Sequence, residues 1–200
     1  VLNQFRATHV EHELLGDVTK QLAFVYRQAG DFASSAVEYR QVADDAADPE
    51  ERSNTLLLAG ELFEDADEAA SALEAFQTYV DEFPKPVEIG LETRFKIAGI
   101  QLSWDAEAEY RDELRRIVAI EADEVSERTP RTRFLAAQSA LVLADASYEH
   151  FKALALAQPF AESLAEKRVR MDQAMTVFEG LVAYELSRIH ISEPTRLQCI

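Results

Sequence analysis

The chain has 200 residues, 48% of them hydrophobic and 28% charged, and its formal net charge at pH 7 is −17. Its apolar side chains can bury a sizeable core, which excludes a disordered chain, and its acidity argues against nonspecific nucleic-acid binding, because phosphate affinity depends on clustered Lys and Arg. With only six glycines and six prolines, the composition favours helices, so the sequence predicts an all-α fold. A single cysteine excludes a disulfide framework.

Direct membrane insertion is not expected in this segment. No stretch reaches the roughly 18 consecutive apolar residues that a membrane helix needs. No charged-then-apolar pattern typical of a signal peptide is found in this segment. Because it begins at Val1 without an initiator methionine, a signal further upstream is an open alternative.

Two helical hairpins are expected near the amino terminus. Residues 1–15 are predicted to be the end of a preceding helix, broken at Gly16. A first repeat is predicted over 16–52 and a second over 53–87, each ending at a proline. Gly30 is expected in the first turn, where a glycine can take a left-handed conformation at little cost. The four helices are expected at about 17–29, 32–46, 56–65 and 69–83.

The two hairpins match at a shift of 37 residues. Small side chains fall on small ones or on a modest aliphatic, and aromatic side chains fall mostly on aromatic ones. A period in this range is typical of a stacked repeat array, in which no hairpin can bury its apolar face alone. Leu22, Ala23, Tyr26, Ser35, Tyr39, Val42 and Pro49 correspond to Ala59, Gly60, Phe63, Ala72, Phe76, Tyr79 and Pro86.

This pattern resembles the tetratricopeptide repeat, a helical hairpin of about 34 residues. The resemblance implies a right-handed α-solenoid of such hairpins, followed here by longer irregular helices. Thr19 departs from the pattern at a large apolar position, Asp67 replaces the turn glycine, and each unit is three residues longer. An ordinary helical bundle is the alternative. The matching residues are Leu56, Ala59, Gly60, Phe63, Ala72, Phe76, Tyr79 and Pro84 in the second copy, and Leu22, Ala23, Tyr26, Gly30, Asp31, Ser35 and Tyr39 in the first.

Beyond the second hairpin the repeat decays while helical periodicity continues. A degenerate third repeat is predicted over 88–128, with a non-standard turn around Trp104. Residues 129–186 are predicted to form a helical extension with a short helix at 148–157 and a long final helix opened by Pro159. Apolar residues of that final helix keep helical spacing: Phe160, Leu164, Met171, Ala174, Phe178 and Leu181.

A wider resemblance covers most of residues 1–186. The runs 94–98 and 134–137 and the block 148–186 look like interior segments of large multi-repeat tetratricopeptide proteins of Gram-negative envelopes. Those proteins are similar to components found beside TonB/ExbB-type energy-transduction or gliding machinery. The resemblance implies a periplasmic scaffold and a fragment of a longer protein, with a cytoplasmic protein as the alternative.

The last residues, 187–200, do not keep the helical spacing of apolar residues, and they resemble translated adapter or vector sequence. They are therefore left out of the fold prediction, and His190 and Cys199 are given no function. A natural extended tail is the alternative.

Charge is distributed unevenly along the chain. Residues 41–82 carry thirteen carboxylates against one basic residue, Arg52, whereas residues 128–170 carry seven basic residues against four acidic ones. A solvated acidic face explains the first stretch. A docking surface for a basic partner is the alternative.

Catalytic motifs are not found in the sequence. His12 begins a zinc-protease-like motif, but Gly16 stands where the second histidine is required. His9 and His12 are expected to face solvent, with a shared metal ion as the alternative. The paired carboxylates of the acidic stretch have no nearby His or Lys to tune them. The sequence therefore predicts a protein that is not an enzyme, with no catalytic residue, no cofactor and no metal site.

Recognition of another protein is the function that remains. In the tetratricopeptide family the first helices of successive repeats line a concave groove, and here the second of them carries an acidic set. The sequence predicts a non-catalytic interaction scaffold that binds a protein or peptide, in particular a basic or extended peptide, and no nucleic acid. A regulatory module of an enzyme whose catalytic domain lies outside this chain is the alternative. The candidate groove residues are Asp17, Lys20, Phe24, Arg27, Asn54, Leu57, Glu61 and Glu64.

Overall fold

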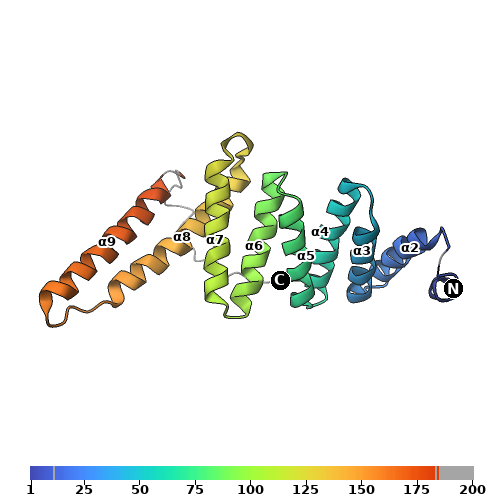
Figure 1. Ribbon diagram of the computed structural model, residues 1–200, viewed down its shortest axis with the longest axis horizontal. Helices are drawn as coiled ribbons and strands as arrows, with labels where there is room; N and C mark the ends of the chain where they lie inside the picture. Colours follow the sequence, from blue (N-terminus) through green and yellow to red (C-terminus); the bar gives the residue numbers. More distant parts are fainter. Residues whose placement is uncertain (11, 183, 185–200) are drawn as a thin grey trace. The chain divides into compact units, whose positions relative to one another are not determined.

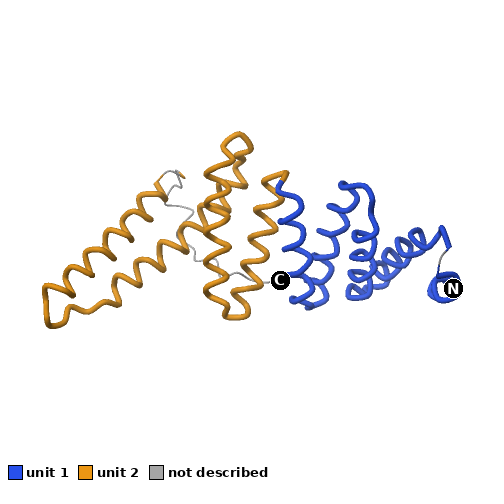
Figure 2. The backbone as a smooth tube through the Cα atoms, in the orientation of Figure 1, with its two compact units in different colours: residues 1–84 blue, residues 85–200 orange. Residues whose placement is uncertain are grey.

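A computed structural model describes residues 1–10, 12–182 and 184 of the chain (Figure 1). The regular structure in these residues is entirely helical, which confirms the predicted all-α fold. The chain divides into two compact units, residues 1–84 and residues 85–200 (Figure 2). None of the helices in the described ranges is both long enough and apolar enough to span a bilayer.

Unit 1 consists of a short helix and two hairpins. The predicted break at Gly16 is wrong, because the first helix already ends at Thr8 and Gly16 lies in the first turn of the second. A glycine costs a helix only about 1 kcal/mol relative to alanine, which packing of the rest of the helix offsets. The helices of unit 1 are α1 (Leu2–Thr8), α2 (Leu15–Gln28), α3 (Phe32–Asp45), α4 (Pro49–Asp65) and α5 (Ala69–Glu82).

α4 begins at Pro49, about two turns before the start predicted near Leu56. The carboxylate of Asp48 accepts hydrogen bonds from the backbone N–H groups of Glu50 and Glu51, at 3.4 and 3.2 Å. Pro49 takes the first helical position, where a missing N–H leaves no intrahelical bond unmade. The Asp-Pro pair that ends one hairpin therefore also opens the next helix.

The repeat positions supply the core of unit 1. Ser35 is fully buried and its hydroxyl donates a 2.8 Å hydrogen bond to the carbonyl of Ala23, which satisfies the polar group inside the first hairpin. Tyr26 is only half-buried, and its hydroxyl accepts a 2.9 Å hydrogen bond from Asn3 of α1. The matched positions buried in both hairpins are Leu22 with Ala59, Ala23 with Gly60, Ser35 with Ala72 and Val42 with Tyr79.

Unit 2 is built on three helices that share one core. Its central apolar cluster joins Val87, Leu91 and Ala98 to Tyr110, Leu114 and Ile117 of the next helix and to Leu135 and Ala136 of the third. The fourth long helix packs against the third. The elements are α6 (Val87–Ser103), α7 (Glu107–Asp123), the 3₁₀ turn η1 (Val125–Glu127), α8 (Pro130–Ala153) and α9 (Phe160–Val182).

α8 is a single continuous helix. The separate short helix predicted at 148–157 is wrong, because α8 runs unbroken to Ala153 and residues 154–157 are not helical. A capping box starts it: the hydroxyl of Thr129 accepts from the Thr132 N–H at 3.1 Å, and the Thr132 hydroxyl accepts from the Thr129 N–H at 2.9 Å. No glycine or proline interrupts the alanine-rich sequence that follows, so the helix continues.

The same backbone turn joins α2 to α3, α4 to α5 and α6 to α7. Gly30, Asp67 and Asp105 have positive φ, at 76°, 58° and 55°. In each turn the N–H of the next residue donates to a carbonyl five positions back, with N···O distances of 2.9, 2.9 and 3.0 Å. This is the Schellman arrangement that ends a helix at a left-handed residue. The turn near Trp104, predicted to be non-standard, is therefore of the same kind as the first two.

Candidate interaction surface

The eight predicted groove residues form two equivalent stripes. On α2 and on α4 the four residues follow spacings of three, four and three, which places each set on one helical face. The two sets are related by the repeat shift of 37 residues. Asp17, Lys20, Phe24, Arg27, Asn54 and Glu61 are exposed, and Leu57 and Glu64 are half-buried.

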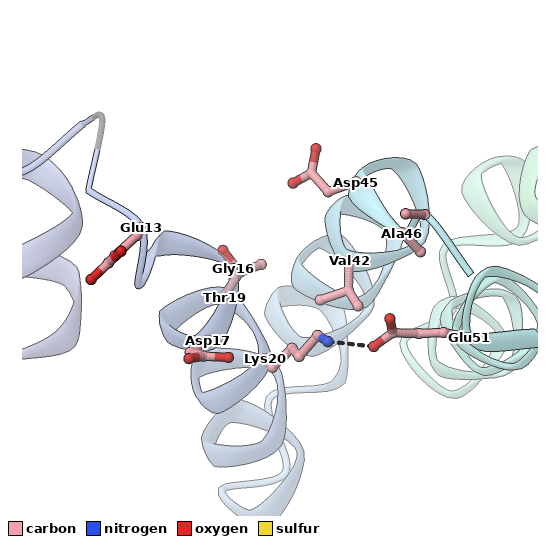
Figure 3. Close-up of a pocket in the computed structure, with 10 residues that line it drawn as sticks. Glu13, Gly16, Asp17, Thr19, Lys20, Val42, Asp45, Ala46 and Glu51 are labelled. Carbon is pink, nitrogen blue, oxygen red and sulfur yellow. Dashed lines mark hydrogen bonds and ion pairs between the residues drawn. The ribbon is translucent and has the colours of Figure 1, made fainter. Parts of the chain in front are cut away.

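The two helices that carry these stripes meet at Lys20. Its ammonium group pairs with the carboxylate of Glu51 in the first turn of α4, one turn before Asn54 (Figure 3). The ion pair therefore places one end of the α2 stripe beside the start of the α4 stripe. Sequence reasoning did not select Glu51, which precedes the helix predicted at 56–65. The signal that could have placed it in the first turn of α4 is Asp48-Pro49 taken as a helix start.

A pocket of about 180 Å³ lies where this ion pair stands. Asp17 and Lys20 belong to it, and Figure 3 shows them with side chains from the end of α3 and the start of α4. Four carboxylates and one ammonium group line the pocket, so its electrostatic character is acidic. Its lining residues are Glu13, Gly16, Asp17, Thr19, Lys20, Val42, Asp45, Ala46, Ala47 and Glu51.

The large apolar residue of the α2 stripe is open to solvent. Phe24 is 52% exposed. An exposed aromatic ring beside polar and charged neighbours is the kind of residue that dominates the energy of protein interfaces once it is covered. Val25 is exposed to a similar extent but lies about 100° further round the helix, outside the stripe.

Unit 1 has a large excess of acidic over basic side chains. Its sequence holds eighteen acidic side chains and five basic ones. Most of the basic side chains already pair with carboxylates of the same unit, so the excess negative charge is left on the surface. These pairs are Arg6 with Glu38, Lys20 with Glu51, Arg40 with Glu74 and Arg52 with Glu82.

Arg52, the one basic residue of the acidic stretch, joins three helices. Its guanidinium donates two hydrogen bonds to Glu82 of α5, at 2.7 and 2.8 Å, and a third to the carbonyl of Ala43 in α3, at 2.6 Å. The hydrogen bonds from Arg52 lower the pKa of the Glu82 carboxyl below its ordinary value. Arg52 therefore acts as a structural link behind the candidate surface and is not available to a ligand.

The two histidines singled out in the sequence lie in the connection between α1 and α2. His9 stacks on Phe5 with ring centroids 4.6 Å apart, and His12 meets the same ring edge-on at 5.3 Å. The Nδ1 atom of His12 accepts a 3.2 Å hydrogen bond from the N–H of Leu14. Within the described residues no group of three or more His, Cys, Asp or Glu side chains is arranged to hold a metal ion.

The regularly spaced apolar residues of the final helix are mostly open to solvent. Ala174 is the buried residue of α9, and Phe160, Leu164, Met171 and Phe178 are exposed. Periodicity identifies an apolar face but does not say whether another element covers it. His190 and Cys199, to which the sequence analysis assigns no function, lie outside the described residues.

No family model matches the chain, and no curated protein matches it. Among solved structures, the crystal structure of MamA protein covers 87% of this chain and 93% of its own, at 17% sequence identity and a TM-score of 0.43. A likeness at this level establishes neither a shared fold nor a shared function.

Proposed function

We propose that this chain is a non-catalytic protein-interaction scaffold, built from tetratricopeptide-like hairpins, that binds a basic extended peptide across α2 and α4. The observation that carries the proposal is the pair of equivalent stripes, one on each of these helices, which the Lys20–Glu51 ion pair joins near one end. A repeated surface offers repeated contacts to an extended chain.

The chemistry of the surface favours a basic partner. Glu61 and Glu64 supply carboxylates on α4, and the pocket at Lys20 adds four more around a single ammonium group. A Lys or Arg side chain of the peptide would enter this acidic pocket, while Phe24 packs against an apolar part of the peptide. Negative potential on this scale disfavours nucleic acid and speeds association with cations.

The wider context extends the same proposal. The hairpins are expected to stack as a right-handed solenoid, and the chain is expected to belong to a larger periplasmic protein of a bacterial envelope. These expectations are supported by the resemblance of its repeats to the tetratricopeptide pattern and of its later segments to envelope proteins.

A peptide titration tests the proposal. A fluorescein-labelled peptide of alternating Lys and Ser with one central Leu should bind the full chain at low salt, and its Glu counterpart should not. Replacing Glu61 and Glu64 by Lys should weaken the Lys peptide at least about tenfold, because two attractive charges become repulsive. Asp81→Lys is the charge control, since Asp81 is an exposed carboxylate on α5. Equal affinity for the wild type and the double variant would reject this surface.

A second pair of variants tests the aromatic contact. Phe24→Ala should lower affinity for the Lys peptide by about tenfold or more, because truncating an aromatic anchor costs over 1 kcal/mol. Val25→Ala removes apolar area of similar exposure from the neighbouring face of α2 and should leave affinity unchanged. If both variants bind alike, the peptide does not lie along the α2 stripe.

A further inference from the structure

α9 holds its place in unit 2 mainly through one of its faces. Phe178, at the border of the next face, also meets Tyr148 of α8 edge-on, with ring centroids 6.5 Å apart. Of its 23 residues, Ala174 is buried, and the half-buried positions flank it on the same side of the helix. On that side the ammonium group of Lys167 donates to the carbonyl of Leu154 at 2.6 Å, and Arg170 donates to the carbonyl of His150 at 3.1 Å. These contacts fix α9 against α8 and account for about a third of its circumference.

A second face of α9 is apolar and open to solvent. It lies about a quarter turn from the face that packs on α8. Six of its seven residues are large and apolar, and each is at least 38% exposed. The seventh, Arg168, stands near the middle. We call this face the α9 stripe: Phe160, Leu164, Arg168, Met171, Met175, Phe178 and Val182.

The spacing of the α9 stripe is that of a helix-pairing seam. Its residues follow one another at intervals of three or four along the full length of α9, as the apolar positions of coiled coils do. When the positions are mirrored about Met171, five of the seven coincide with stripe positions and the other two are displaced by one residue. A helix with this property can pack on an identical helix that runs in the opposite direction, with every layer occupied.

We propose that the α9 stripe is the contact surface of a symmetric dimer, in which α9 of a second copy of this chain packs antiparallel against it. In the register that overlaps the two helices fully, Met171 meets Met171 of the second copy on the two-fold axis. Such an interface is self-complementary, because each contact occurs twice. The other layers pair Phe160 with Val182, Leu164 with Phe178 and Arg168 with Met175.

Charge complementarity supports a second copy as the occupant. Arg168 and Asp172 border the same edge of the α9 stripe, and neither side chain forms an ion pair within the described part of the chain. Antiparallel pairing about Met171 brings Arg168 of one copy within about one helical turn of Asp172 of the other, and the symmetry repeats the pair. The ion pair with Asp172 of the second copy thus accounts for Arg168, a basic residue among the apolar residues of the α9 stripe.

Sedimentation velocity of the full chain over about 1 to 100 μM is the first test. The wild type should show a dimer whose fraction grows with concentration. Met171→Glu should weaken dimerisation at least about 100-fold, because two like charges meet on the two-fold axis. Val169→Glu is the matched control: Val169 is 55% exposed on the opposite face of α9 and should leave the dimer intact. A wild type that stays monomeric throughout, as expected if a different protein covers the stripe, overturns the proposal.

A charge exchange tests the register and does not depend on Met171. Arg168→Asp alone and Asp172→Arg alone should each weaken the dimer, because each places like charges together. The double variant should restore it, since the pair is rebuilt with its signs reversed. Circular dichroism of all three variants checks that their helix content is unchanged. A double variant no stronger than the singles rules out the proposed register.

Cross-linking locates the two-fold axis. In a Cys199→Ser background, Met171→Cys should form a disulfide-linked dimer on mild oxidation, because the two sulfur atoms face each other across the axis. Val169→Cys in the same background should form no disulfide-linked dimer, because Val169 lies on the opposite face of α9. Equal cross-linking at both positions would contradict the assignment.

Discussion

Gly60 of α4 lies directly against the ring of Phe76 of α5: a Cβ atom on Gly60 would stand 2.5 Å from Cε1 of that ring. Phe76 is fully buried, so its ring has no free space to move into. The small residue that the repeat places at this position is therefore required by the aromatic residue opposite it.

Gly60→Ala should lower the free energy of unfolding by about 2 kcal/mol, because overpacking a filled core outweighs the better helix propensity of alanine. Gly99→Ala is the control. Gly99 lies within α6 with no heavy atom near its Cβ position, so this substitution should stabilise the chain by about 1 kcal/mol. Urea titration followed by circular dichroism measures both, and a stabilising Gly60→Ala would contradict the packing described.

Arg52→Ala should cost about 2 kcal/mol, because it removes the forked contact to Glu82 and leaves the Ala43 carbonyl without its donor. Arg52→Lys keeps the charge but not the planar fork, and should cost about half as much. Arg111→Ala breaks an exposed ion pair within one helix and should change stability by less than about 0.5 kcal/mol. Equal effects at Arg52 and Arg111 would show that the three-helix link contributes nothing.

The Glu82 contact should make stability depend on acid pH. Because Arg52 lowers the pKa of Glu82 in the folded state, the contribution is complete above the unfolded pKa of about 4.3 and is lost as pH falls through the lower folded value. The difference in urea midpoint between the wild type and Glu82→Gln should therefore be constant from pH 7 to about 5 and shrink below about pH 4. A difference that is the same at pH 3 and pH 7 would exclude this linkage.

Asp67→Gly should stabilise the chain by about 0.5 kcal/mol, because glycine adopts the left-handed conformation with no Cβ strain. Asp67→Val should cost more than about 1 kcal/mol, since a β-branched residue disfavours that conformation most. The opposite change, Gly30→Ala, should also destabilise. Thermal unfolding compares the three variants, and a neutral Asp67→Val would show that the turn has rearranged.

Much of the fold could be predicted from the sequence, because small and aromatic residues recur at the positions where a hairpin must bury a side chain. Ala23, Ala59 and Ala72 are all fully buried, as their place in the pattern required. The start of α4 was missed because Asp48-Pro49 was interpreted only as a stop signal, although the same pair caps the following helix. A proline alone does not tell which side of it is helical.

The candidate surface could be predicted from the sequence only in part. Spacing selected the residues of the α2 and α4 stripes, but the ion pair between Lys20 and Glu51 joins residues 31 positions apart and depends on how the two hairpins pack. The exposure of the α9 stripe could not be predicted either. An apolar helix face has the same sequence pattern whether a neighbour covers it or not. Only the structure shows that α8 covers mainly a different side of α9 and meets the stripe at Phe178.

The shared left-handed turn also determines where the chain can change length. In each turn the closing hydrogen bond joins an N–H to the carbonyl five residues back, so the ring spans six residues. An added residue inside it would break this hydrogen bond. Gly30 and Asp67 are 37 residues apart and Asp67 and Asp105 are 38 apart, and the extra residue falls in the connection 83–86, which is one residue longer than the connection 46–48. Insertions should therefore be tolerated at these two connections, provided that Asp48 still caps α4, and rejected at residues 29–31, 66–68 and 104–106.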